Sequence, residues 1–189
     1  MSPIGLKKTL IHPNTLIIYR ITAIPAIVIL LHFPGRICAL TAAILFSAAA
    51  VTDYLDGYLA RKRGLVTTFG RVMDPVADKL LVSATFIMLT ARGWVPAWMV
   101  CVIIGREIAV TGLRNIIAES REDVSATWLG KYKTGFQIAA IIPLAIHYPY
   151  WGVDMNAIGR FFLWGALVFT VWSGFDYFIR FRKLLRLNG

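Results

Sequence analysis

Four aspartates in a largely apolar part of the chain have the residue type and spacing best suited to chemistry. Asp53, Asp56, Asp74 and Asp78 fall within 26 positions, although the chain has only ten acidic residues. A carboxylate beside hydrocarbon is costly unless it is paired, hydrated or bound to a cation. Four neighbouring carboxylates repel one another, and hard divalent cations relieve that repulsion. The pattern therefore predicts a metal site of oxygen ligands, suited to Mg²⁺, Mn²⁺ or Ca²⁺ rather than Zn²⁺.

The spacing puts these aspartates on two helix faces, because positions three or four apart lie on one side of a helix. The first face holds Asp53, Asp56, Gly57 and Ala60, with Arg61 at its border. The second face holds Gly70, Asp74 and Asp78. The small residues leave room for a ligand between antiparallel helices. Two cations could bind a diphosphate in that space. Arg61 could donate hydrogen bonds to one of its phosphates. The alternative is that the aspartates only pair with nearby basic residues at a hydrated helix end.

The helices that must position these faces are expected to cross a membrane. The chain has 189 residues, 58% of them hydrophobic and 16% charged, which is too apolar for an ordinary soluble domain of this size. Apolar runs of about 20 residues, the length that spans a bilayer, recur along it. We expect one all-α integral membrane domain over 1–189, because isolated spans must satisfy their own backbone hydrogen bonds. The six expected transmembrane helices are 13–33, 36–62, 71–92, 94–118, 131–149 and 157–182.

The distribution of basic residues predicts the orientation. With a cytoplasmic N-terminus, fourteen Lys and Arg residues fall on the inner side and only Arg36, Arg92 and Arg160 on the outer side. Basic residues accumulate on the cytoplasmic side of membrane proteins. Both termini and the aspartates are therefore expected to be cytoplasmic. Residues 2–11 favour a short amphipathic helix on the membrane surface, with a disordered tail as the alternative.

The net charge of +10 raises the question of a nucleic-acid partner. The basic residues flank apolar segments and do not form a polar face, and the sequence has no recognisable nucleic-acid motif. Membrane lipids with anionic headgroups and phosphorylated substrates are the expected partners, and nucleic acid is not.

The pattern Asp53-x2-Asp56-Gly57-x2-Ala60-Arg61-x8-Gly70-x3-Asp74-x3-Asp78 resembles the full signature of the CDP-alcohol phosphotransferase family. The resemblance implies the six-helix fold of that family and a homodimer in a bacterial cytoplasmic membrane. It also implies an enzyme that moves a phosphatidyl-type group from a CDP-linked lipid to an alcohol, releases CMP and uses two Mg²⁺ or Mn²⁺ ions.

The resemblance also implies a role for each position of the signature. Asp53, Asp56 and Asp74 would bind metal, and Asp78 would act as general base for the acceptor hydroxyl while also touching the second ion. The CDP site would be lined by Gly57, Ala60, Arg61 and Gly70.

Two further stretches, 105–114 and 129–137, resemble the branch of this family that makes phosphatidylglycerophosphate. That branch implies CDP-diacylglycerol as donor and glycerol 3-phosphate as acceptor. A phosphorylated acceptor needs cations near the cytoplasmic side. The candidates for binding its phosphate are Arg106, Arg114, Lys131 and Lys133. They could instead be positive-inside anchors, and Glu107 could simply pair with neighbours.

The sequence leaves two other functions open. Inositol phosphate is the nearest alternative acceptor. A cation transporter or channel is the alternative from another class, but the sequence shows none of the internal repeats that are common in transporters.

Overall fold

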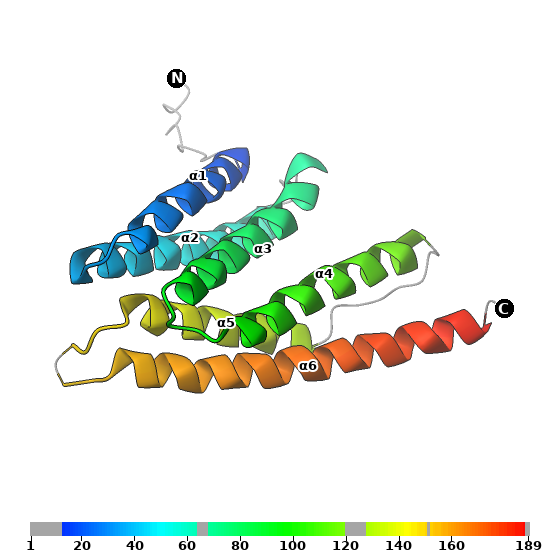
Figure 1. Ribbon diagram of the computed structural model, residues 1–189. Helices are drawn as coiled ribbons and strands as arrows, with labels where there is room; N and C mark the ends of the chain where they lie inside the picture. The colour runs from blue at the N-terminus through cyan, green and yellow to red at the C-terminus, as the bar shows by residue number, and fades with distance from the viewer. Residues whose placement is uncertain (1–12, 64–67, 120–127, 151, 188–189) are drawn as a thin grey trace, which may run out of the picture.

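The computed structural model describes residues 13–63, 68–119, 128–150 and 152–187 (Figure 1). Six helices follow one another: α1 (Pro13–His32), α2 (Arg36–Arg63), α3 (Thr68–Ala91), α4 (Ala97–Glu119), α5 (Trp128–Ile146) and α6 (Met155–Leu187). In this part of the chain there is no strand, only an isolated bridge between Tyr150 and Val153. The expected all-α fold of six helices is confirmed. The expected surface helix at the N-terminus lies outside the described residues.

Short connections join the helices at the end of the molecule that is remote from the aspartates. Gly93 follows α3 with a φ of +71°, a conformation that favours glycine, and its N–H donates to the Thr90 carbonyl. Asp154 caps α6, because its Oδ1 accepts from the backbone N–H groups of Asn156 and Ala157 at 2.9 and 3.2 Å. These tight ends fix adjacent helices as antiparallel neighbours.

The helices α5 and α6 pack side by side and make the most extensive contact in the fold (Figure 1). Gly159 of α6 lies against Leu144, and Gly165 lies against the ring of Phe136. A Cβ at either glycine would fall 2.5 Å from the nearest carbon of that neighbour. The missing side chains therefore let two backbones approach closely, as small residues do between membrane helices.

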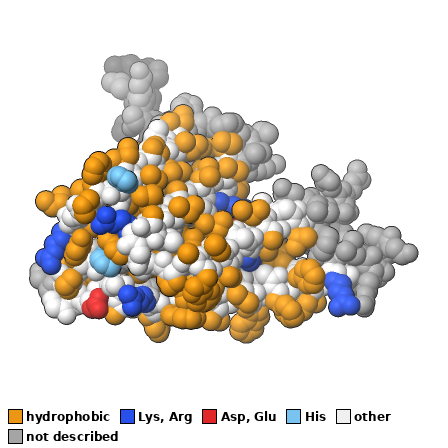
Figure 2. All heavy atoms as spheres, viewed as in Figure 1, with side chains coloured by type: hydrophobic (Ala, Val, Ile, Leu, Met, Phe, Trp, Pro, Cys, Tyr) orange, Lys and Arg blue, Asp and Glu red, His pale blue; other side chains and the backbone are white. Residues whose placement is uncertain are grey.

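The interior is apolar, and so is much of the exterior. Phe46, Phe86 and Leu163 are at most 1% exposed in the core. Large apolar side chains also cover much of the face seen in Figure 2, and Phe161 is 72% exposed. Such an exterior is unusual for a monomer in water.

One described helix is both long and apolar enough to cross a membrane, at Met155–Ile179 within α6. Three other apolar stretches are shorter: Ile17–His32, Arg36–Thr52 and Tyr132–Ile146. The helices α3 and α4 contain charged residues such as Asp78, Lys79, Arg106 and Glu107, which lower their mean hydropathy. These are the residues that build the site.

Candidate active site

The aspartates lie on the two helices that the sequence predicted. Asp53 and Asp56 belong to the second half of α2, and Asp74 and Asp78 to the first half of α3. The predicted CDP-binding residues follow the same division, with Gly57, Ala60 and Arg61 on α2 and Gly70 on α3. Side chains from 53 to 72 lie outside the described part. Asp74 and Asp78 are one helical turn apart and both are partly buried.

Arg20 of α1 holds the carboxylate of Asp78. Its Nη1 lies 2.8 Å from Asp78 Oδ1, and the Arg20 side chain is only 3% exposed whereas that of Asp78 is 45% exposed. A charge-assisted hydrogen bond from a buried guanidinium restrains the orientation of the carboxylate. An arginine in an apolar stretch can extend its charged end to the interface or pair with an acidic residue, and Arg20 pairs with Asp78.

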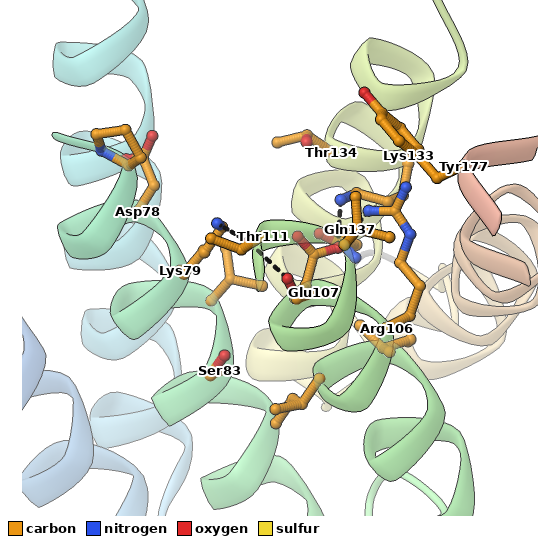
Figure 3. A pocket seen from close by; sticks show the side chains of 15 residues that line it. Asp78, Lys79, Ser83, Arg106, Glu107, Thr111, Lys133, Thr134, Gln137 and Tyr177 are labelled. Carbon is orange, nitrogen blue, oxygen red and sulfur yellow. Dashed lines mark hydrogen bonds and ion pairs between the residues drawn. The ribbon is translucent and has the colours of Figure 1, made fainter. Parts of the chain in front are cut away.

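A cavity of about 240 Å³, lined by both polar and apolar side chains, opens between α3, α4 and α5, with one wall completed by α6 (Figure 3). Its charged and amide-bearing wall consists of Asp78, Lys79, Arg106, Glu107, Lys133 and Gln137. Asp78 and two of the predicted acceptor cations thus line a single space. The other two predicted cations, Arg114 and Lys131, have side chains outside the described part.

Glu107 links the cations of this cavity. Its Oε1 accepts from Arg106 Nη1 at 3.3 Å and from Lys133 Nζ. Arg106 also donates from Nη2 to Ser173 Oγ of α6 at 2.9 Å. Glu107 therefore pairs with neighbouring residues, which is the alternative that the sequence left open. This pairing fixes the two cations at the cavity wall.

A second chain of hydrogen bonds positions Lys79. Its Nζ donates to Thr111 Oγ1, and Thr111 Oγ1 donates to the Glu107 carbonyl at 2.6 Å. Lys79, Arg106 and Lys133 supply three positive charges to the cavity, against the two carboxylates of Glu107 and Asp78. The excess of cations and donors suits an anionic, oxygen-rich ligand.

Several residues of the cavity were not among the predicted site residues. They are Lys79, Thr111, Gln137 and Tyr177, none of which belongs to the predicted metal, CDP or acceptor sites. One signal was available for Gln137, because it lies four positions after Lys133 and so shares its face of α5.

The carboxylates of Asp74 and Asp78 are hard oxygen donors, which is the donor chemistry that Mg²⁺ and Mn²⁺ prefer. Within the described side chains no three His, Cys, Asp or Glu residues come together as a metal site. The two described aspartates fit half of the predicted ligand set.

Comparison with known proteins shows the family to which this chain belongs. The model of the CDP-alcohol phosphatidyltransferase family matches residues 10–172. The chain is 46% identical over 189 residues to the CDP-diacylglycerol–glycerol-3-phosphate 3-phosphatidyltransferase of Bacillus subtilis (strain 168), with 94% of this chain and 98% of that relative covered.

Proteins of the same name from two other bacteria are also similar. The one from Rickettsia bellii is 37% identical over 90% of this chain and 95% of its own length. The one from Escherichia coli (strain K12) is 37% identical over 87% of this chain and 91% of its own length. This chain is therefore a member of the CDP-alcohol phosphatidyltransferase family.

Proposed function

We propose that this protein transfers the phosphatidyl group of CDP-diacylglycerol to sn-glycerol 3-phosphate, giving phosphatidylglycerophosphate and CMP. The observation that carries the proposal is that Asp78 and the cations Lys79, Arg106 and Lys133 line one cavity. A phosphorylated alcohol that acts as acceptor requires two kinds of group. A carboxylate must accept the proton of its hydroxyl, and cations must bind its phosphate. The names of the bacterial relatives support this choice of donor and acceptor.

In the proposed reaction, Asp78 accepts the proton of the primary hydroxyl of glycerol 3-phosphate. The hydroxyl oxygen forms a bond to the lipid-side phosphorus of the diphosphate, and the bond from that phosphorus to the oxygen of CMP breaks. Arg20 holds Asp78 Oδ1 at 2.8 Å and so orients the carboxylate for this transfer. Lys79, Arg106 and Lys133 hold the acceptor phosphate, and Arg114 and Lys131 are proposed to assist them.

Divalent cations belong to this proposal. Asp53, Asp56, Asp74 and Asp78 would hold two ions, Mg²⁺ or Mn²⁺, which neutralise charge on the diphosphate when bound. Gly57, Ala60 and Arg61 of α2 and Gly70 of α3 would line the CDP site. Removal of divalent ions with EDTA should abolish CMP release, and addition of Mg²⁺ or Mn²⁺ should restore it.

We further propose that the six helices cross a bacterial cytoplasmic membrane as one domain, with both termini and the active site on the cytoplasmic side. The exposed apolar side chains of Ile37, Ile108 and Phe161, which are 82%, 69% and 72% exposed, support contact with lipid. A homodimer in the membrane is proposed as well.

A panel of acceptors tests the function. Purified protein in detergent micelles containing CDP-diacylglycerol and Mg²⁺ is given glycerol 3-phosphate, inositol phosphate or serine, and CMP release and the lipid product are measured. We expect turnover with glycerol 3-phosphate and formation of phosphatidylglycerophosphate. Turnover with inositol phosphate in the absence of any with glycerol 3-phosphate would overturn the proposal.

A further inference from the structure

Gln137 is a buried residue whose side-chain amide lies at the cavity wall. It is only 3% exposed, and its Nε2 has no acceptor among the described residues. Buried amide N–H groups in proteins are nearly always paired, and an unpaired one is costly. An unpaired donor at the wall of a binding cavity indicates that the donor forms a hydrogen bond with an oxygen of the bound ligand.

The side chains around Gln137 indicate which chemical group of the ligand accepts this hydrogen bond. Figure 3 shows its side chain beside Glu107 and Lys133. Lys133 and Arg106 both donate to Glu107 Oε1, and a carboxylate has further acceptor sites on its other oxygen, Oε2. The amide donor therefore lies near a carboxylate oxygen that can accept.

A neighbouring donor and acceptor suit a hydroxyl group better than a phosphate. A hydroxyl accepts one hydrogen bond through its oxygen and donates another through its proton. A phosphate oxygen only accepts, and it would meet the like charge of Glu107. Lys79, Arg106 and Lys133 already offer the phosphate charged donors on the same cavity wall.

We propose that Gln137 is a specificity-determining residue, donating from Nε2 to the secondary hydroxyl of the phosphorylated acceptor while Glu107 Oε2 accepts from that hydroxyl. The inference rests on the proposed function, because glycerol 3-phosphate has one hydroxyl that reacts and one that does not. Gln137 would form a hydrogen bond with the secondary hydroxyl, which does not react. The site would thus select a phosphorylated alcohol with a hydroxyl beside the attacking carbon.

The first test needs only the unaltered protein. 3-Hydroxypropyl phosphate keeps the phosphate and the reacting primary hydroxyl of glycerol 3-phosphate but lacks the secondary hydroxyl. We expect its kcat/KM to be at least about tenfold lower, because the analogue leaves buried polar groups unpaired. Equal kcat/KM values would overturn the role of Gln137 while leaving the proposed function standing. No turnover with either acceptor would overturn the proposed function, and this inference with it.

The second test changes the residue. In Gln137→Leu the ratio of kcat/KM for the two acceptors should fall to within about threefold of one, mainly through a loss with glycerol 3-phosphate. The ratio is measured in one preparation, so a reduced fraction of folded protein does not alter it. Retention of the unaltered protein's ratio would overturn the proposal. Gln137→Met provides the same test with an unbranched side chain if the leucine variant does not fold.

Thr170→Val is a matched control. Thr170 of α6 is fully buried, its Oγ1 also lacks a hydrogen-bond partner among the described residues, and it does not line the cavity. Its removal should leave the ratio of the two kcat/KM values unchanged. A change in that ratio equal to the change in Gln137→Leu would show that buried polar groups affect selectivity regardless of place, and would overturn the assignment.

Discussion

Arg20 and Asp78 are 58 positions apart in the sequence, yet Arg20 Nη1 lies 2.8 Å from Asp78 Oδ1. The guanidinium approaches from the buried side, on α1, while the carboxylate stays 45% exposed and lines the cavity. Arg20 can therefore restrain one carboxylate oxygen while leaving Asp78 accessible to a substrate. This arrangement gives Arg20 a positioning role in the proposed reaction.

Replacing Arg20 should lower kcat more than it changes either KM. In Arg20→Met the carboxylate loses its restraint, and a misplaced catalytic group lowers the rate by roughly 10- to 100-fold. Arg20→Lys should recover part of the loss, because an ammonium keeps the charge without the planar fork. The measurement is kcat and KM for both substrates by CMP release.

Arg160→Met is the control for this change. Arg160 is exposed on α6, where its Nε donates to Asn156 Oδ1 at 3.2 Å. Its loss should leave kcat unchanged. An Arg20→Met protein with unaltered kcat would remove Arg20 from the positioning role.

Asp78→Asn should abolish transfer without abolishing metal binding. The amide keeps the shape of the carboxylate but cannot act as base, and general-base catalysis contributes about 10²- to 10⁴-fold. The remaining three aspartates should still bind Mn²⁺ more weakly, as measured by calorimetry. Asp154→Asn is the control, because asparagine caps a helix as well as aspartate does. Undiminished CMP release in Asp78→Asn would exclude Asp78 as the base.

The helices could be predicted from apolar runs, but their ends depend on local chemistry. The run around α5 was expected to continue to residue 149, yet the helix ends at Ile146 and His147 has a φ of +59°. Pro149 disfavours a helical conformation at Tyr148, which accounts for the early end. At α6 the helix runs to Leu187 rather than 182, because basic residues end an apolar run without ending a helix.

The positions of the site residues could be predicted only where spacing along one helix determines which residues share a face. Asp74 and Asp78 share a face of α3 because they are four positions apart. Arg20 in an apolar stretch could snorkel or pair, and the sequence could not choose Asp78 over the other aspartates as its partner. Likewise, the contact of Lys79 with Thr111 joins α3 to α4 and depends on how these helices pack.

Replacing Lys133 should weaken the binding of the acceptor alone. Lys133 lines the cavity and is fixed by Glu107, so Lys133→Met removes one charged donor to the acceptor phosphate. Hydrogen bonds to charged groups contribute about 1.5–3 kcal/mol, so KM for glycerol 3-phosphate should rise by roughly 10- to 100-fold. KM for CDP-diacylglycerol should stay the same. Both values come from CMP release at varied concentrations of each substrate.

Arg92→Met is the control for Lys133. Arg92 follows α3 at the end remote from the cavity, where its guanidinium lies 5.1 Å from the ring centre of Trp94. KM for glycerol 3-phosphate should not change in this variant. An equal rise of both KM values in Lys133→Met would contradict a role confined to the acceptor.

Gly159→Ala should destabilise the contact between α5 and α6. The new Cβ would lie 2.5 Å from Leu144 Cγ and 2.9 Å from the backbone N of the same residue. Leu144 is fully buried, so neither atom can move away without disturbing the core. Overpacking of this kind lowers the free energy of unfolding by about 1–3 kcal/mol. Thermal unfolding in detergent, followed by tryptophan fluorescence, measures the loss as a lower Tm.

Gly135→Ala separates this steric effect from the effect of alanine itself. Gly135 is also in α5, but a Cβ there would meet no atom within 4 Å. Since alanine favours a helix over glycine by up to about 1 kcal/mol, Gly135→Ala should keep or raise Tm. The two substitutions should therefore shift Tm in opposite directions, and only the packing around each glycine would account for that difference. If Gly159→Ala unfolded at the same temperature as Gly135→Ala, the close approach of α6 to α5 would be wrong.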